Sequence, residues 1–122
     1  TFIINGNTIT NSTFNGIGFV VGGTGQVLSQ VNGNVFTGNG TNATVEVIVG
    51  DTATFGLDLE DNQNDDVYSL FRENTGAVFQ VEQLTTLTNP KPGGAGNTGT
   101  VDISTGPISV DPTEVPNGTF TF

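Results

Sequence analysis

Short apolar runs alternate with polar turns rich in Asn and Gly, and one such pattern recurs along the chain. Residues 4–10 follow the order apolar, Asn, Gly, Asn, any residue, apolar, Thr, and residues 31–37 repeat this order 27 residues later. A weaker third copy begins at Leu59, where Asn62 stands 28 residues after Asn34. A β-type motif that returns at a nearly constant interval is typical of stacked coils. We therefore expect residues about 27 apart to lie one layer above another.

The apolar runs have the period of strands and not of helices. No window places apolar residues at three- and four-residue spacing over two turns, and β-branched residues and Gly dominate. In residues 45–49 the valines alternate with Glu46 and Ile48, as in a strand with one buried face. We expect strands at 2–4, 8–10, 17–21, 26–31, 35–37, 45–49, 54–59, 67–71 and 78–84. The predicted inward-facing residues are Ile4, Ile9, Ile17, Phe19, Val31, Phe36, Val45, Val47, Leu57, Leu59, Leu70, Phe79 and Val81.

The recurring asparagines have two interpretations. Asn at equivalent positions of stacked coils can hydrogen-bond side chain to side chain along the stack. Alternatively, Asn-Gly marks the hairpin turns of an antiparallel β-sandwich or jelly roll. Two heptapeptides in phase favour the stacked ladder of Asn7, Asn34 and Asn62.

The repeat fades after residue 84. Residues 85–99 contain Pro90, Pro92 and a Gly-Gly pair, which predict a loop, and Pro112 and Pro116 interrupt the sequence that follows. Short strands are expected at 101–103, 107–110 and 119–122. We expect one domain, with coils over residues 1–84 and a Pro/Gly-rich loop with an irregular β segment over residues 85–122.

The pattern apolar-Asn-Gly-Asn-x-Ile-Thr, followed by Gly-Ile-Gly-Phe at residues 16–19, resembles the right-handed parallel β-helix repeats of bacterial secreted and surface proteins. The resemblance covers about residues 2–84 and implies an all-β fold with about three coils of right-handed parallel β-helix. Some proteins with such coils cleave acidic polysaccharides, using clustered Asp residues with a His and an Arg-Ile-Lys element. This chain has no His and no such basic element.

Composition and charge exclude several classes of partner. The 122 residues contain twelve acidic and two basic side chains, a net charge of −10, so nucleic acid binding is excluded for want of a basic surface. Apolar residues make up 34%, which suits a narrow core, and no segment approaches the length of a membrane span. The chain has no Cys or Met, which fits oxidising surroundings, so we expect an extracellular or cell-surface location.

The densest group of charges lies in residues 58–66. Hard carboxylate oxygens suit Ca²⁺, but the spacing matches no established calcium motif, and a solvated acidic turn explains the same residues. The candidate calcium ligands are Asp58, Glu60, Asp61, Asp65 and Asp66. We expect no other cofactor, no catalytic residues and no enzymatic activity, because a histidine base and aromatic sugar platforms are both lacking.

The two ends of the chain carry apolar strand patterns without a polar cap. Unpaired sheet edges are normally covered, so either a longer parent protein supplies the cover or a neighbouring copy adds a strand. We expect a structural, self-assembling surface or fibre subunit whose partner is another copy of itself. The alternative is a carbohydrate-binding or carbohydrate-cleaving module that uses the face of residues 58–66. The candidate joining residues are Phe2, Ile3, Ile4, Thr119, Phe120, Thr121 and Phe122.

Overall fold

The computed structural model describes residues 1–39, 43–103 and 111–122, which form an all-β structure of parallel sheets. One 3₁₀ turn, η1 (Leu84–Thr86), follows the tenth strand. The strands are β1 (Phe2–Asn5), β2 (Thr8–Thr10), β3 (Ile17–Val21), β4 (Gln26–Asn32), β5 (Val35–Thr37), β6 (Val45–Val49), β7 (Thr54–Glu60), β8 (Gln63–Asn64), β9 (Val67–Arg72), β10 (Val78–Glu82), β11 (Thr100–Asp102) and β12 (Thr113–Val115).

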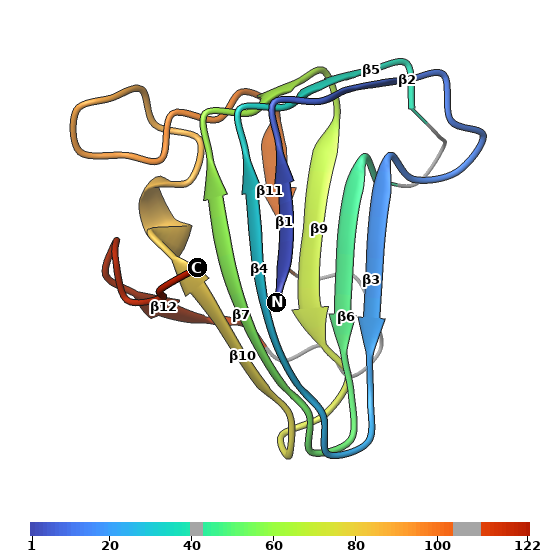
Figure 1. The fold of residues 1–122 in the computed structure, drawn as a ribbon, viewed down its shortest axis with the longest axis vertical. Coiled ribbons are helices and arrows are strands. Elements are labelled where there is room, and N and C mark those ends of the chain that lie inside the picture. The colour runs from blue at the N-terminus through green and yellow to red at the C-terminus, as the bar shows by residue number, and fades with distance from the viewer. Residues whose placement is uncertain (40–42, 104–110) are drawn as a thin grey trace.

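The chain passes through three sheets in turn. Sheet A has the order β1-β4-β7-β10-β12, sheet B the order β2-β5-β8, and sheet C the order β11-β9-β6-β3. We call each passage through the three sheets a circuit, so the first circuit is β1, β2 and β3. Figure 1 shows the successive circuits lying side by side, with the segment after β10 at the end of sheet A opposite to β1.

The register of the strands confirms that residues one repeat apart are neighbours. Ile4 pairs with Val31, and Val31 pairs with Leu59, as the recurring motif predicts. Every strand pair within the described residues is parallel, so the antiparallel sandwich proposed as the alternative is wrong. The interpretation of Asn-Gly as a hairpin turn is wrong, because these turns join strands of different sheets and not neighbouring strands of one sheet.

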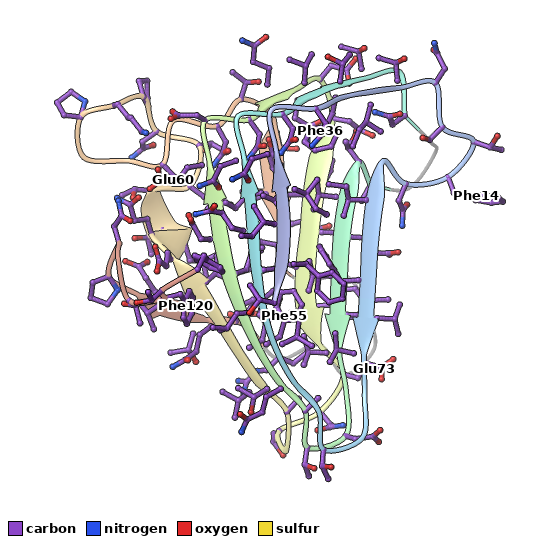
Figure 2. All side chains as sticks on the ribbon, in the orientation of Figure 1. Phe14, Phe36, Phe55, Glu60, Glu73 and Phe120 are labelled. Carbon is purple, nitrogen blue, oxygen red and sulfur yellow. The ribbon has the colours of Figure 1, made fainter. Side chains whose placement is uncertain are left out.

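The core lies between the three sheets. Ten of the predicted inward residues are buried, and the other three, Ile4, Ile9 and Phe19, are partly buried and pack against them. Phe55 is labelled in Figure 2, and its ring centroid lies 5.4 Å from that of Phe19 and 5.4 Å from that of Phe79, so aromatic side chains follow one another through the core. Aromatic pairs at this separation add to the stabilisation from burial alone.

The C-terminal part departs from the prediction. β11 pairs with β9 and β12 pairs with β10, so residues 100–102 and 113–115 extend sheets C and A. The expected strand at 107–110 lies outside the described residues. The expected strand at 119–122 is wrong: these residues form no strand, because the N–H groups of Gly118 and Phe120 bind the buried carboxylate of Glu82, at 3.0 and 2.7 Å. The ring of Phe120 lies over Gly56, on the outer face of sheet A.

Candidate assembly edge

The turn between sheets A and B has the same backbone form in every circuit. Its central residue takes a positive φ: +67° at Gly6, +64° at Gly33, +54° at Asp61 and +75° at Gly96. Glycine adopts this left-handed region without steric cost, and Asp tolerates it better than most residues. The Asn that follows each of these residues is therefore presented in the same orientation, layer after layer.

These asparagines form a continuous hydrogen-bonded column, which we call the asparagine ladder: Asn7, Asn34, Asn62 and Asn97. The main-chain N–H and the Nδ2 of Asn34 both donate to the Oδ1 of Asn62, at 3.0 and 2.9 Å. Asn62 donates in the same way to Asn97, with both distances at 2.9 Å. Asn7 does so to Asn34, at 2.9 and 3.1 Å. The predicted ladder is present, and it has a direction, since donors point toward the C-terminal circuits.

Each interior amide is also bound to the backbone of the preceding circuit. The Nδ2 of Asn34 donates to the carbonyl of Ile4 at 2.7 Å, and the Nδ2 of Asn62 donates to Val31 at 2.7 Å. Buried amides need such complete pairing, because an unpaired one costs about 1–3 kcal/mol. The ladder thus fixes the register of the strands at the corner where sheets A and B meet.

The ladder ends at Asn97. Its N–H and Nδ2 both donate to the main-chain carbonyl of Leu87, at 3.3 and 2.8 Å. Leu87 lies just after η1, in the segment inserted between β10 and β11. This carbonyl occupies the acceptor position that the Oδ1 of a further Asn would have. The sequence analysis missed Asn97 because the insertion lengthens the step from Asn62 to 35 residues. The sequence did contain a signal for Asn97, since Gly96-Asn97 repeats the Gly-Asn order of Gly6-Asn7 and Gly33-Asn34.

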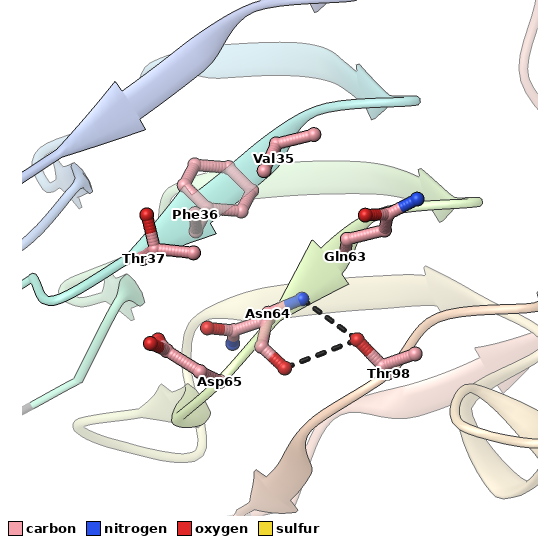
Figure 3. Close-up of a pocket in the computed structure, with 7 residues that line it drawn as sticks. All are labelled: Val35, Phe36, Thr37, Gln63, Asn64, Asp65 and Thr98. Carbon is pink, nitrogen blue, oxygen red and sulfur yellow. Dashed lines mark hydrogen bonds between the residues drawn. The ribbon is translucent and has the colours of Figure 1, made fainter.

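Sheet B ends in a similar way. The hydroxyl of Thr98 accepts from the N–H of Asn64 at 2.8 Å and donates to its carbonyl at 3.0 Å, as Figure 3 shows. One side chain therefore satisfies the backbone that a next strand would have paired. Phe36, Asn64, Asp65 and Thr98 help to line a shallow pocket of about 220 Å³ at this place.

The outermost strand of sheet A at this end, β12, carries features that protect sheet edges. It has only three residues and lies between Pro112 and Pro116, which have no N–H to donate. Glu114 places a charge on the strand, and its carboxylate accepts from the N–H of Thr85 at 2.7 Å. That hydrogen bond lowers the pKa of the Glu114 carboxyl. Charge and proline both oppose the addition of another strand.

Within the described residues, no strand pairs with the outer side of the first circuit. β1, β2 and β3 are each the outermost strand of their sheet. Phe2 and Ile3 on β1 are 53% and 58% exposed, and Val20 on β3 is 79% exposed. Within the described residues, the Oδ1 of Asn7 accepts no hydrogen bond, although its ladder equivalents each accept two. The predicted N-terminal joining residues therefore lie on the outermost strand of sheet A in the described residues, with Phe2 and Ile3 exposed and Ile4 partly buried.

Charge is divided along the chain in a way that the sequence analysis overlooked. All twelve acidic and both basic residues lie in residues 46–122, so the side chains of residues 1–45 carry no charge. The first circuit is therefore neutral, while later circuits carry the whole net charge of −10. The uneven distribution of charge is visible in the sequence, but only the fold shows that the uncharged residues form one end of the stack.

The five candidate calcium ligands do not converge. The buried carboxylate of Asp58 accepts from Gln30 and Asn32, at 2.9 and 3.0 Å, and the carboxylate of Asp65 accepts from the N–H of Gly38. Asp61 binds Lys91 at 2.6 Å. No group of three or more acidic side chains in the described ranges could hold a metal ion. Asp58 and Glu60 alternate with the core-facing residues of β7, and of the five only Glu60 and Asp61 share a partner, the ammonium of Lys91.

Lys91 connects the inserted segment to the turn after β7. Its ammonium lies 3.4 Å from Glu60 and 2.6 Å from Asp61. The hydrogen bond to Asp61 raises the pKa of the Lys91 ammonium. Because the side chains of Lys91 and Asp61 are about half exposed, we expect this ion pair to contribute at most about 1 kcal/mol. Its effect is to hold the insertion close to the end of the asparagine ladder.

Comparisons of the chain with protein-family models, curated proteins and solved structures found no match. Of the residues that the structure describes, none belongs to a helix with the length and apolarity needed to cross a membrane.

Proposed function

We propose that the chain is a right-handed parallel β-helix that serves as an extracellular structural protein, and that copies associate through the edge strands of the first circuit. The observation that carries the proposal is that β1, β2 and β3 are all outermost strands, with the apolar side chains of Phe2 and Ile3 more than half exposed. Parallel pairing at a spacing of 27 to 28 residues supports the helical fold, since parallel crossovers are right-handed in about 98% of cases.

Association at this edge has two physical driving forces. Unpaired N–H and C=O groups of an outer strand are a template for another strand. Phe2 and Ile3 are a little more than half exposed, so burying the rest of either side chain contributes about 1–1.5 kcal/mol. Neither a charge nor a proline on β1 opposes the contact, whereas both occur on or beside β12. The residues at 119–122 have no part in this proposal, because they form no strand and the ring of Phe120 lies over Gly56 of sheet A.

A carbohydrate-binding role has less support. The carboxylate of Asp58 is already bound to two amide side chains, and the pocket beside Thr98 is smaller than the roughly 300 Å³ at which small-molecule sites usually begin. The hydroxyl of Thr98 is itself used on the backbone of Asn64. A structural role would instead use the outermost strand β1 and the exposed side chains of Phe2 and Ile3.

The proposal is tested by placing a charge on the exposed edge. Ile3→Lys introduces a desolvated ammonium into any contact made by β1, so we expect sedimentation velocity to show wild-type association and a largely monomeric variant. Val78→Lys is the matched control. Val78 is also a β-branched apolar residue with an exposed side chain (42%), but it lies on β10 and not on the first circuit. Circular dichroism checks that both variants fold. A wild-type protein that sediments as a monomer at every concentration up to the millimolar range contradicts the proposal.

A further inference from the structure

We propose that Asn117 is a site of spontaneous covalent modification, where water converts the side-chain amide into a carboxylate and so releases segment 116–122 from sheet A. This chemistry is independent of association through the first circuit. Asn followed by Gly is the pair at which such deamidation is fastest, because glycine leaves the peptide nitrogen sterically accessible. The chain contains five such pairs, at Asn5, Asn15, Asn32, Asn39 and Asn117.

Deamidation proceeds through a cyclic imide and consumes one water molecule. The peptide nitrogen of the glycine attacks the Cγ atom of the Asn, and the new N–Cγ bond replaces the Cγ–Nδ2 bond. The amide leaves as ammonia and takes the proton of the glycine N–H. Water then opens the ring at either carbonyl carbon, which gives aspartate or isoaspartate and adds one negative charge. The first step requires that the glycine nitrogen and the Asn side chain can turn toward each other.

The stacked circuits prevent that movement at Asn32. The N–H of Gly33 donates to the carbonyl of Glu60 at 2.9 Å. The side chain of Asn32 donates to Asp58 at 3.0 Å and accepts from the N–H of Glu60 at 2.9 Å. The pair at Asn5 is held in the same way by the second circuit. Both reacting groups of these two pairs are therefore fixed.

The pair at Asn15 is also fixed. The N–H of Gly16 donates to the carbonyl of Thr44 at 2.8 Å, and the side chain of Asn15 donates to Glu46 at 2.7 Å. A Cβ at Gly16 would lie 3.1 Å from the same carbonyl, so the backbone is closely packed there. The glycine that follows Asn39 lies outside the described residues.

The pair at Asn117 differs from these three. Asn117 is exposed in the turn after β12, and within the described residues its side chain makes no hydrogen bond. Gly118 has a φ of +75°, and a Cβ at this position would meet nothing within 4 Å. The side chain therefore has room to turn. The reacting nitrogen is restrained by one hydrogen bond, from the N–H of Gly118 to the carboxylate of Glu82 at 3.0 Å.

Glu82 on β10 thus controls the reaction. Its carboxylate is buried and accepts from Gly118 through one oxygen and from the N–H of Phe120 through the other, at 2.7 Å. A buried charge needs such donors, because leaving it without them is costly. While this contact is intact, the nitrogen of Gly118 is held toward Glu82. Deamidation therefore proceeds from local openings in which segment 116–122 leaves β10.

Either product weakens the contact that delays its formation. An aspartate at position 117 adds a carboxylate beside the residue that binds Glu82, and like charges repel. An isoaspartate adds one carbon to the main chain before Gly118, which displaces the N–H groups of residues 118 and 120 relative to β10. The ring of Phe120, labelled in Figure 2, then leaves its place over Gly56. Modification at Asn117 is thus an irreversible release of the segment from sheet A.

The unmodified chain provides the first test. We incubate it in mildly alkaline buffer, folded or unfolded in urea, and measure deamidation at each pair by proteolysis and tandem mass spectrometry. In the folded protein we expect Asn117 to react at least about tenfold faster than Asn5, Asn15 and Asn32, because only its pair opens locally. In urea the four rates should agree within about threefold, since unfolding removes the hydrogen bonds that distinguish them. Equal rates in the folded protein, or the same spread in urea, overturn the proposal.

Variants test the control by Glu82. Glu82→Gln replaces one acceptor oxygen by an amide donor, so we expect deamidation at Asn117 to accelerate at least about threefold, with the other pairs unchanged. Glu114→Gln is the matched control, because the carboxylate of Glu114 binds Thr85 and not segment 116–122. An unaltered rate at Asn117 in Glu82→Gln, or acceleration at all four pairs alike, contradicts a local control.

Asn117→Asp reproduces one of the two products. We expect faster hydrogen exchange at the N–H groups of residues 118 and 120 in this variant than in the parent chain, because the contact with Glu82 is weakened. Asn117→Gln, which adds no charge, is the control and should leave this exchange unchanged. Unaltered exchange in Asn117→Asp overturns the release of the segment by this product.

Discussion

The main-chain carbonyl of Leu87 accepts both the N–H and the side-chain amide of Asn97, and this single oxygen ends a column of asparagines that runs through four circuits. The column is a buried polar network in which every interior member is satisfied. Such networks specify register strongly, because slipping one strand would leave several buried groups unpaired at once.

Truncating an interior member of the ladder should destabilise the protein strongly. Asn62 is fully buried, donates to Val31 and Asn97, and accepts from Asn34. Asn62→Ala leaves these partners unpaired, so we expect the free energy of unfolding to fall by about 3 kcal/mol in urea titrations. Asn7→Ala, at the exposed end of the ladder, is the control and should cost about 1 kcal/mol or less. Equal losses for the two variants would contradict a cooperative ladder.

The aromatic column should be equally sensitive at its centre. Phe55 is completely buried and contacts the rings of Phe19 and Phe79. Phe55→Ala opens a cavity and should lower the free energy of unfolding by about 3–5 kcal/mol, measured by thermal melting. Phe14→Ala is the comparison, since Phe14 is 70% exposed, and we expect a change within about 0.5 kcal/mol. A small effect of Phe55→Ala would mean that the core is not packed around this ring.

Gly56 provides a test of the C-terminal segment. A Cβ at this position would lie 2.7 Å from Leu28 and 2.7 Å from the ring of Phe120. Gly56→Ala should therefore push Phe120 off the outer face of sheet A, at a cost of about 1–3 kcal/mol. Hydrogen exchange at residues 118 and 120, whose N–H groups bind Glu82, should accelerate.

The control for this variant is Gly18→Ala. Gly18 also lies within a strand, but a Cβ there meets nothing closer than 3.7 Å. We expect no change in exchange near the C-terminus for Gly18→Ala. If Gly56→Ala leaves the exchange of residues 118 and 120 unaltered, the tail does not pack over this glycine.

Tyr68 should make stability depend on alkaline pH. Its side chain is fully buried, and burial raises the pKa of the Tyr68 phenol above its ordinary value near 10. Above about pH 10 the unfolded chain releases the phenolic proton while the folded chain retains it, so the free energy of unfolding falls as pH rises.

Tyr68 is the only tyrosine, so its ionisation can be followed by ultraviolet absorbance without interference from another phenol. We expect no tyrosinate signal at pH 10–11 until the protein unfolds. Tyr68→Phe should remove this part of the pH dependence, and the difference between the two proteins excludes the contribution of Lys91, which titrates in both. Tyrosinate absorbance in a protein that is still folded at pH 10 would contradict the burial.

The first eighty residues were predictable from sequence because their repeat is nearly constant. A step of 27 or 28 residues placed Asn34 and Asn62 correctly in the ladder, and strict alternation at Val45 and Val47 identified the inward face. The constant step and the alternation of apolar residues were therefore sufficient to predict which residues of successive circuits are neighbours.

The last forty residues were less predictable because an insertion breaks that constancy. Residues 84–94 separate β10 from the turn at Gly96, so Asn97 lies outside the expected interval. β12 was hidden between Pro112 and Pro116, which usually argue against a strand but are tolerated at an edge. The openness of the first circuit depends on which strands lie outermost, and only the three-dimensional order of the sheets gives that.

The uneven placement of charge also gives the molecule a permanent electric orientation. Residues 1–45 carry no charged side chain and residues 46–122 carry all twelve acidic ones, so an external field or a cationic support acts mainly on the later circuits. On a positively charged resin or mineral surface, each molecule would be held by its acidic circuits with the apolar edge of β1 directed away from the support. A layer prepared in this way would present one uniform face to whatever is added next.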